Sequence, residues 1–228
     1  MLNNNEYKIF PLGDSALTIE LGGEISGELN TFAITLSHQI ADSDFPGFIE
    51  SVPAYSSVSV FYDPLKTVRL ARPRETCFLA VQRLVSELCA RVSTGKTKEK
   101  PAIEVPVDFS QKSAPDLEFL AKYSGLERES VVDIFITREY RVYMLGFLPG
   151  FPYMGKVDQR ISVPRLDSPR KLVLRGSVGI AGRQTGIYPV NCPGGWRLIG
   201  RTDIEPFSRD RTPPTLFAPG DRVRFVRV

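Results

Sequence analysis

Apolar residues in the N-terminal part of the chain alternate between strand-like and helix-like spacing. Two short apolar runs, Tyr7–Pro11 and Ala16–Leu21, are separated by turn residues around Gly13 and predict a β-hairpin. Apolar residues then recur at helical spacing between Leu29 and Ile40, and turn-forming residues follow from Asp42. This pattern predicts an amphipathic helix.

Two more strands and a second helix are expected before residue 92. Phe48–Val52 and Val58–Tyr62 have the composition of strands, and Pro73 is suited to start a helix. The expected buried stripe of that helix consists of Phe78, Val81, Leu84, Val85 and Leu88. The order β-β-α-β-β-α predicts a small α/β domain over residues 1–94.

The run Ser93–Pro101 is polar, charged and bounded by proline, so it cannot supply core residues and is typical of a connection between domains. We therefore predict a second domain over residues 95–228. Its expected first elements are a strand at Ile103–Val107, helices at Pro115–Tyr123 and Glu127–Ile134, and a strand at Arg141–Leu145.

Beyond Gly146 the helical period disappears. Short β-branched runs at Lys171–Leu174, Ile187–Val190 and Val223–Val228 alternate with glycine and proline turns, which is typical of an irregular barrel or sandwich. The predicted fold class is therefore an α+β N-terminal domain followed by a mostly β barrel domain.

The composition is that of a globular protein, with 228 residues of which 42% are hydrophobic and 24% charged. The first residues lack the basic and apolar regions of a secretory leader, and no window approaches the roughly 18 apolar residues of a membrane span. We expect a cytoplasmic protein without a membrane partner. Cys77, Cys89 and Cys192 are odd in number and lack C-x-x-C spacing, which argues against disulfides and a cysteine zinc site.

Basic charge is concentrated between Tyr140 and Arg201. That segment holds ten Lys and Arg residues against only Asp158 and Asp167, while the rest of the chain is net acidic. A local positive field favours an anionic ligand or an acidic partner. Nucleic acid is not an expected partner, because the arginines are neither interleaved with stacking aromatics nor placed along one amphipathic helix.

A spaced glycine run, Gly176–Gly182, precedes the hydrogen-bond donors Arg183, Gln184 and Thr185. Without Cβ atoms, such a run lets a backbone approach a ligand while neighbouring side chains donate to it. A set of barrel-corner turns explains the glycines equally well when they are taken alone. The nearby Arg175 favours the first interpretation, a site for carboxylate, phosphate or amide groups.

The segment Gly150–Lys156 has the spacing of a phosphate-binding P-loop, but Val157 stands where a hydroxyl should coordinate magnesium. The following residues, Asp158–Pro164, lack a helical period, although a P-loop leads into a helix N-terminus. We interpret the match as chance.

No self-sufficient catalytic group is predicted, and no metal site. The only histidine, His38, belongs to the other domain and is expected to be structural or on the surface. Cys192 precedes a flexible turn but has no histidine base within its own domain. Asp158 and Asp167 could act as a base or a magnesium ligand, yet exposed turn carboxylates are common.

Three long motif blocks, Tyr140–Gly155, Gly176–Pro189 and Pro193–Thr202, resemble the KipI / 5-oxoprolinase B-subunit family, also labelled allophanate hydrolase subunit 1. Related sequences form the carboxyltransferase subdomains C and D of urea amidolyases. GDSAL at Gly13–Leu17 and the segment Val52–Pro64 also fit, so the resemblance spans nearly the whole chain.

The resemblance implies a cyclophilin-like β-barrel and a role as a non-autonomous subunit of a hydrolase. The implied reaction is the ATP-dependent opening of 5-oxoproline, a small lactam, to glutamate. The implied partners are the KipA-like (C) and LamB/YcsF-like (A) subunits, with ATP and Mg as co-substrate of the complex and no tightly bound cofactor. Two alternatives stay open: inhibition of a sporulation-type histidine kinase, and hydrolysis of allophanate or another urea derivative.

Only positions within the matching motifs are carried over as candidates for binding substrate or nucleotide, and the catalytic acid or base is unknown. These candidates are Arg141, Pro149, Gly150, Phe151, Pro152, Tyr153, Arg175, Ser177, Gly179, Gly182, Gln184, Thr185, Tyr188, Gly194, Gly195, Trp196 and Arg201.

Two positions depart from the family pattern. Relatives commonly have a His-Thr or His-Ser pair shortly before the position of Tyr140, where this chain has Phe135–Thr137. If that histidine takes part in the chemistry, the activity of this chain is in doubt. Cys192 stands where relatives commonly have serine, which argues that it is a tolerated replacement and not a nucleophile.

Overall fold

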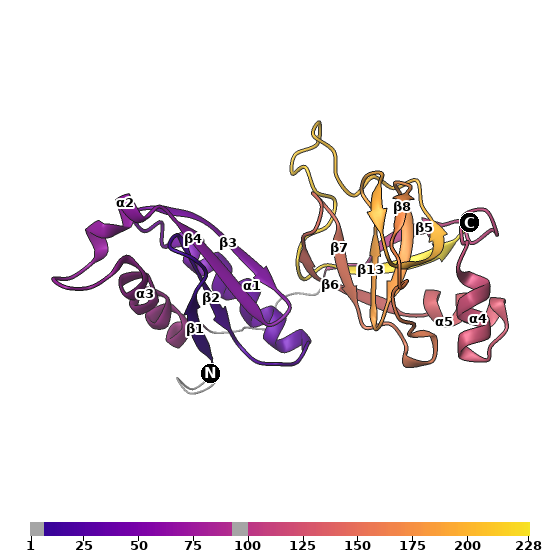
Figure 1. The fold of residues 1–228 in the computed structure, drawn as a ribbon, viewed down its shortest axis with the longest axis horizontal. Helices are drawn as coiled ribbons and strands as arrows, with labels where there is room; N and C mark the ends of the chain where they lie inside the picture. The colour runs from indigo at the N-terminus through magenta and orange to yellow at the C-terminus, as the bar shows by residue number, and fades with distance from the viewer. Residues whose placement is uncertain (1–6, 93–99) are drawn as a thin grey trace. The chain divides into compact units, whose positions relative to one another are not determined.

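The computed structural model describes residues 7–92 and 100–228 (Figure 1). The chain divides into two compact units, Met1–Lys98 and Glu99–Val228. The domain boundary expected between residues 94 and 95 lies outside the described residues and stays a prediction. The predicted fold class is confirmed, with an α/β unit followed by a mostly β unit that forms a nearly closed barrel.

The first unit is an antiparallel sheet of four strands in the order β1-β2-β4-β3, covered by helices. The predicted hairpin is present, because β1 pairs with β2 in antiparallel register. The bounds are β1 Lys8–Pro11, β2 Ala16–Glu20, α1 Gly27–Asp42, β3 Phe48–Ala54, β4 Ser57–Tyr62, α2 Pro64–Thr67, a 3-10 turn Val68–Leu70 and α3 Cys77–Arg91.

Helices α1 and α3 pack on one face of this sheet, as the alternating burial of β4 requires. Val58, Val60 and Tyr62 are buried while the residues between them are half-exposed. Helix α1 begins where the Ser26 hydroxyl accepts from the backbone of the first turn, as N-capping serines do. The helix that was expected to begin at Pro73 is α3, and it begins at Cys77.

The start of α3 is shifted because Thr76 caps it. The Thr76 hydroxyl accepts from the Leu79 backbone N–H at 3.2 Å, which satisfies a free donor of the first turn. Of the expected stripe, Val81 and Val85 are fully buried, while the larger side chains lie at the edge of the core.

The second unit is a seven-stranded mixed sheet in the order β12-β9-β10-β7-β6-β13-β5. Its elements are β5 Ile103–Val107, α4 Leu117–Ser124, α5 Arg128–Ile136, β6 Glu139–Leu145, β7 Pro152–Gly155, a 3-10 turn Gln159–Ile161, β8 Arg170–Val173, β9 Ser177–Ala181, β10 Gln184–Ile187, β11 Cys192–Gly194, β12 Arg197–Arg201 and β13 Arg222–Arg227. Strands β8 and β11 form a separate two-stranded ribbon.

One expectation about this unit is wrong. The Ile187–Val190 run is not a strand, because β10 ends at Ile187. Of the two interpretations left open for the glycine run, barrel-corner turns do not apply to most of it, because Ser177–Ala181 is strand β9, which pairs with both β10 and β12.

A pair of backbone hydrogen bonds joins the two edges of the sheet. The Asp108 N–H donates to the Arg201 carbonyl at 2.8 Å, and the Arg201 N–H donates back to Asp108 at 3.0 Å. This bridge links the end of β5 to the end of β12 and nearly closes the barrel around a core that includes Val142, Ile180 and Phe225. Helices α4 and α5 lie together at one end of the barrel (Figure 1).

Candidate functional site

The three motif blocks meet on the outer face of the barrel. Arg141 on β6 lies opposite Gly155 on β7, which in turn lies opposite Gln184 on β10. Residues directly opposite each other in a sheet share a face, so Arg141 and Gln184 flank a position without a side chain. Residues from the first and second motif blocks are therefore brought together by strand pairing.

An aromatic cluster, made of Phe151, Tyr153, Tyr188 and Trp196, covers the neighbouring part of this face. The Phe151 ring makes edge-to-face contacts with Tyr188 at 5.2 Å and with Trp196 at 5.4 Å between ring centroids. Tyr153 packs against Phe151 at 4.8 Å. Each motif block supplies at least one of these four rings, so burial of this cluster adds to the strand pairing that holds the blocks together.

The glycines of the motifs make room for these rings. A Cβ on Gly186 would lie 2.8 Å from Phe151 Cζ, and one on Gly179 would lie 3.0 Å from the Trp196 Cβ. A Cβ on Gly194 would lie 2.5 Å from the Tyr188 hydroxyl oxygen. A packing role therefore accounts for Gly179 and Gly194, in addition to Gly186, which was not a candidate.

None of the polar side chains described below for this face gains or loses a proton near neutral pH. Burial lowers the pKa of the half-buried Arg141 guanidinium from its usual value. Burial also raises the pKa of the Tyr143 phenol, and it raises that of Tyr188 to about 12. The half-buried Arg141 cation is therefore the group of these three that a ligand could reach, whereas Tyr143 and Tyr188 are buried, neutral phenols.

A second group of candidates gathers at one end of the barrel, around Arg175 and Arg201. The Arg201 Nε donates to the Arg175 carbonyl at 3.2 Å, while the Arg175 guanidinium pairs with Glu205 at 2.7 Å. Gly176 is required here, because its φ is +81° and a Cβ would lie 2.0 Å from the Thr202 carbonyl oxygen. The second and third motif blocks are thus also joined at this end.

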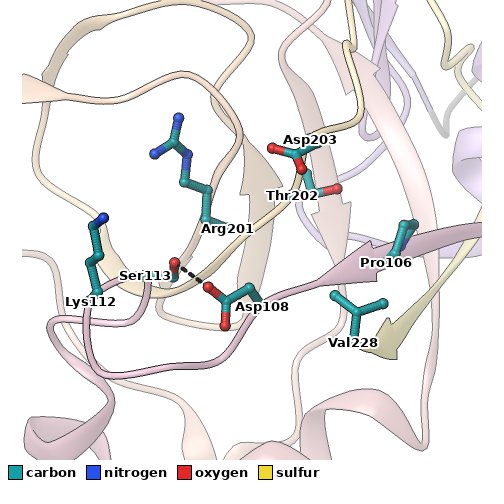
Figure 2. A pocket seen from close by; sticks show the side chains of 8 residues that line it. All are labelled: Pro106, Asp108, Lys112, Ser113, Arg201, Thr202, Asp203 and Val228. Atoms are coloured by element: carbon teal, nitrogen blue, oxygen red, sulfur yellow. Dashed lines mark hydrogen bonds between the residues drawn. The ribbon is translucent and has the colours of Figure 1, made fainter.

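Arg201 lines a pocket of about 310 Å³ beside the hydrogen bonds that close the barrel. We call it the seam pocket, and Figure 2 shows its lining side chains. The lining residues are Pro106, Asp108, Lys112, Ser113, Arg201, Thr202, Asp203 and Val228.

Asp108 is fixed in the wall of the seam pocket. Its carboxylate accepts from the Ser113 hydroxyl at 2.5 Å and from the backbone and hydroxyl of Ser110 at 2.8 and 2.9 Å. These hydrogen bonds, that of Ser113 first, lower the pKa of Asp108 below its ordinary value. Asp108 therefore stays ionised and serves to order the loop that carries Lys112 and Ser113.

The cations of the seam pocket are less engaged. Within residues 7–92 and 100–228, Lys112 has no ion-pair partner, and Arg201 uses only its Nε, in the bond to Arg175. In Figure 2 both side chains extend away from the bonded pair of Asp108 and Ser113. The pocket thus presents an ammonium and the outer edge of a guanidinium to an incoming ligand.

The structure gathers most of the predicted residues at two locations. Arg141, Phe151, Pro152, Tyr153, Gly179, Gln184, Tyr188, Gly194 and Trp196 belong to the outer face or its packing, and Arg175, Ser177 and Arg201 belong to the barrel end. Thr185 instead faces the barrel core, because it pairs with Met154 and Ile180 and is fully buried. Gly150 lies against Pro206 and Phe207. Gly195 lies near Pro169 beside the ribbon, Pro149 is exposed just before the aromatic cluster, and Gly182 ends β9 with a φ of +57°.

Sequence reasoning missed Asp108, Lys112, Ser113 and Asp203. The available signal was a cluster of polar residues directly after the predicted strand Ile103–Val107. Nothing local indicated that this cluster would meet Arg201, since the bridge between the two segments is a long-range pairing.

The side chains considered for catalysis are either exposed or held in structural contacts. His38 is exposed on α1, as expected. Asp158 is held by Arg160 at 3.0 Å and by Arg138 at 2.6 Å, which gives it a structural role. The P-loop-like segment contains strand β7 and leads into a 3-10 turn instead of a helix, which agrees with a chance match.

Neither a metal cluster nor a membrane span occurs in the described part of the chain. Residues 7–92 and 100–228 hold no group of three His, Cys, Asp or Glu side chains arranged to bind a metal ion. No described helix is long and apolar enough to cross a membrane.

Comparison with known proteins gives matches over most of the chain. Residues 7–217 match the family model of the carboxyltransferase domain, subdomain C and D. The 5-oxoprolinase B subunit of Bacillus subtilis (strain 168) is 44% identical over 223 residues, which cover 97% of this chain and 93% of that protein. The 5-oxoprolinase B subunit of Escherichia coli O157:H7 is 36% identical, with 96% and 95% of the two chains covered.

A solved structure agrees with the fold. The crystal structure of the protein TTHA0988 has a TM-score of 0.80 and 34% sequence identity over 93% of this chain. This chain spans about 40% of that protein.

Proposed function

This chain belongs to the family of the carboxyltransferase domain, subdomain C and D, as its motif blocks predicted, and from that premise we propose that it is the B subunit of an ATP-dependent 5-oxoprolinase. The observation that carries the proposal is the 44% identity to a 5-oxoprolinase B subunit over nearly the full length of both chains. Similarity of this extent supports a shared role as well as a shared fold.

The reaction proposed for the complex opens the lactam of 5-oxoproline to glutamate. Attack of the amide oxygen on the γ-phosphorus of ATP releases ADP and removes the amide resonance. Water then adds to the activated carbon, and the C–N bond breaks as the ring nitrogen takes up a proton, which leaves an acyl phosphate on the side-chain carboxyl of glutamate. A second water hydrolyses this acyl phosphate and releases glutamate and phosphate. The contribution expected from this chain is binding and orientation, because its outer face and seam pocket offer cations and hydrogen-bond donors.

Proton transfer is assigned to the other chains of the complex. The phenols of Tyr143 and Tyr188 stay protonated at neutral pH, since burial raises their pKa values. Cys192 is equally unsuited to transfer a proton, because burial raises the pKa of its thiol. The KipA-like and LamB/YcsF-like subunits would complete the active site, and ATP with Mg would enter as co-substrate of the whole complex.

Reconstitution tests the proposal. The chain is co-expressed with its KipA-like and LamB/YcsF-like partners, and ATP-dependent release of glutamate from 5-oxoproline is measured. We expect activity that requires all three chains, so that omission of this chain or of ATP removes it. A pure, assembled complex that releases no glutamate would refute the proposal.

Inhibition of a histidine kinase and hydrolysis of a urea derivative remain the alternatives. The same preparation separates them, because a complex that hydrolyses allophanate but leaves 5-oxoproline intact supports the second alternative. Failure to associate with the KipA-like partner, together with tight binding to a histidine kinase, supports the first.

A further inference from the structure

The seam pocket combines two cations that are available to a ligand. Lys112 comes from the loop after β5 and Arg201 from the end of β12, so the bonds that close the barrel bring them to one cavity. Both side chains are exposed, and in the described ranges neither has a carboxylate within ion-pairing distance. An ammonium and a guanidinium edge on one cavity are suited to an oxyanion.

The carboxylates of the pocket narrow the choice of anion. Asp108 is occupied by hydroxyl and backbone donors from its own loop, whereas Asp203 is exposed and accepts no hydrogen bond from the described residues. Two acidic groups beside two basic ones leave the pocket close to neutral, so a polyanion such as a triphosphate would meet repulsion. A ligand with a single carboxylate and an N–H group for Asp203 matches both signs of charge.

The size of the pocket agrees with a small ligand. A volume of about 310 Å³ corresponds to roughly ten water molecules at about 30 Å³ each, which is at the lower end of ligand sites. A five-membered lactam acid or an amino acid fits within this volume with room left for bound water.

We propose that the seam pocket binds a small carboxylic acid that also carries an N–H donor, with the carboxylate on Lys112 and Arg201 and the N–H on Asp203. Identification of that acid as the lactam substrate or its amino-acid product rests on the proposed function. The chemistry of the site does not, because it follows from the charges and volume of the pocket.

Direct binding to the full chain tests the pocket without the partners. The probes are 5-oxoproline, glutamate, inorganic phosphate and ATP, titrated into the 15N-labelled chain and followed by chemical-shift changes. Lys112→Gln and Arg201→Gln remove the two cations, and Asp203→Asn removes the acceptor. Lys122→Gln and Arg209→Gln are matched controls, because both are exposed cations outside the pocket lining.

We expect saturable binding of 5-oxoproline or glutamate with shifts at the seam pocket. Each cation variant should weaken it about tenfold or more, as expected for loss of a charge-assisted hydrogen bond, and neither control should change it. Folding of each variant is checked from its amide spectrum, and Arg201→Lys should retain part of the affinity if charge is what matters.

Three results would overturn the inference. The first is that neither 5-oxoproline nor glutamate binds at millimolar concentration. The second is that the pocket variants and the control variants bind the acids with equal affinity. The third is that phosphate or ATP binds in preference to the acids. Loss of activity in the reconstituted complex tests a different statement. If the chain binds the acids through Lys112 and Arg201 but the complex releases no glutamate, the pocket stands and the proposed reaction falls.

Discussion

Replacement of Gly186 by alanine tests whether the motif glycines serve packing. A Cβ at this position would lie 2.8 Å from the Phe151 Cζ and 2.8 Å from the Pro152 carbonyl oxygen, where ordinary contacts begin at 3.4 Å. One of these neighbours is backbone, so the ring and strand β7 must both move by about half an ångström or more. Overpacking of this kind costs about 1–3 kcal/mol.

The expected cost should appear as a fall in melting temperature of about 3–10 °C. Trp196 makes this measurement specific, because it is the only tryptophan of the chain and its ring contacts Phe151 at 5.4 Å. Thermal unfolding followed by tryptophan emission therefore reports on the cluster that the substitution disturbs. A shifted emission maximum in the folded protein is expected as well, because displacement of Phe151 changes the surroundings of the indole.

Gly195→Ala is the matched control. Its Cβ would meet only Pro169 and the Leu166 carbonyl, at 3.7 to 3.9 Å, so the melting temperature should change by less than about 2 °C. If instead the motif glycines serve ligand approach alone, Gly186→Ala melts like the parent protein and loses only binding. That result, or an equal loss of stability in both variants, would refute the packing argument.

Three further predictions concern polar groups that are buried or half-buried. Thr185→Val removes the hydrogen bond, 2.9 Å long, that the buried Thr185 hydroxyl donates to the Gly179 carbonyl. It should lower the free energy of unfolding, measured by urea titration, by about 1 kcal/mol. Unchanged stability would contradict this prediction. Arg160 and Arg138 hold the pKa of Asp158 well below its usual value. The stability that these ion pairs give the folded protein is therefore complete above about pH 4, and it is lost as the pH falls through the folded-state pKa of Asp158. Acid unfolding of Asp158→Asn should accordingly depend less on pH between about 4 and 2, and an identical pH profile would count against the ion pairs. Burial raises the pKa of the Cys192 thiol, so alkylation at neutral pH should be slower than that of an unperturbed cysteine. Cys192→Ser should keep the activity of the reconstituted complex, and loss of that activity would restore the cysteine as a candidate catalyst.

The N-terminal elements were predictable because their signals are local. Helical spacing from Leu29 to Ile40 and the hairpin turn around Gly13 each depend on residues a few positions apart. The start of α3 was misplaced by four residues, because a threonine cap at Thr76 outweighed the preference of Pro73 for a helix start.

The glycine-rich half was harder to predict, because the same residue type serves turns, close packing and ligand approach. Gly176 has a positive φ, which local sequence can suggest, but Gly179 lies within strand β9 under the Trp196 side chain. Which role a glycine has depends on the ring that tertiary packing places above it.

The sequence by itself determined the fold class, the family and the concentration of donors between Tyr140 and Arg201, because each depends on composition and on long motifs in chain order. Only the tertiary structure decided how those donors are divided between an outer face and a seam pocket. The pocket arises where the Asp108 and Arg201 backbones pair across the closing edge of the barrel. Pairing of this kind brings together residues that are distant in the chain, and no local pattern records which edges of a sheet will meet.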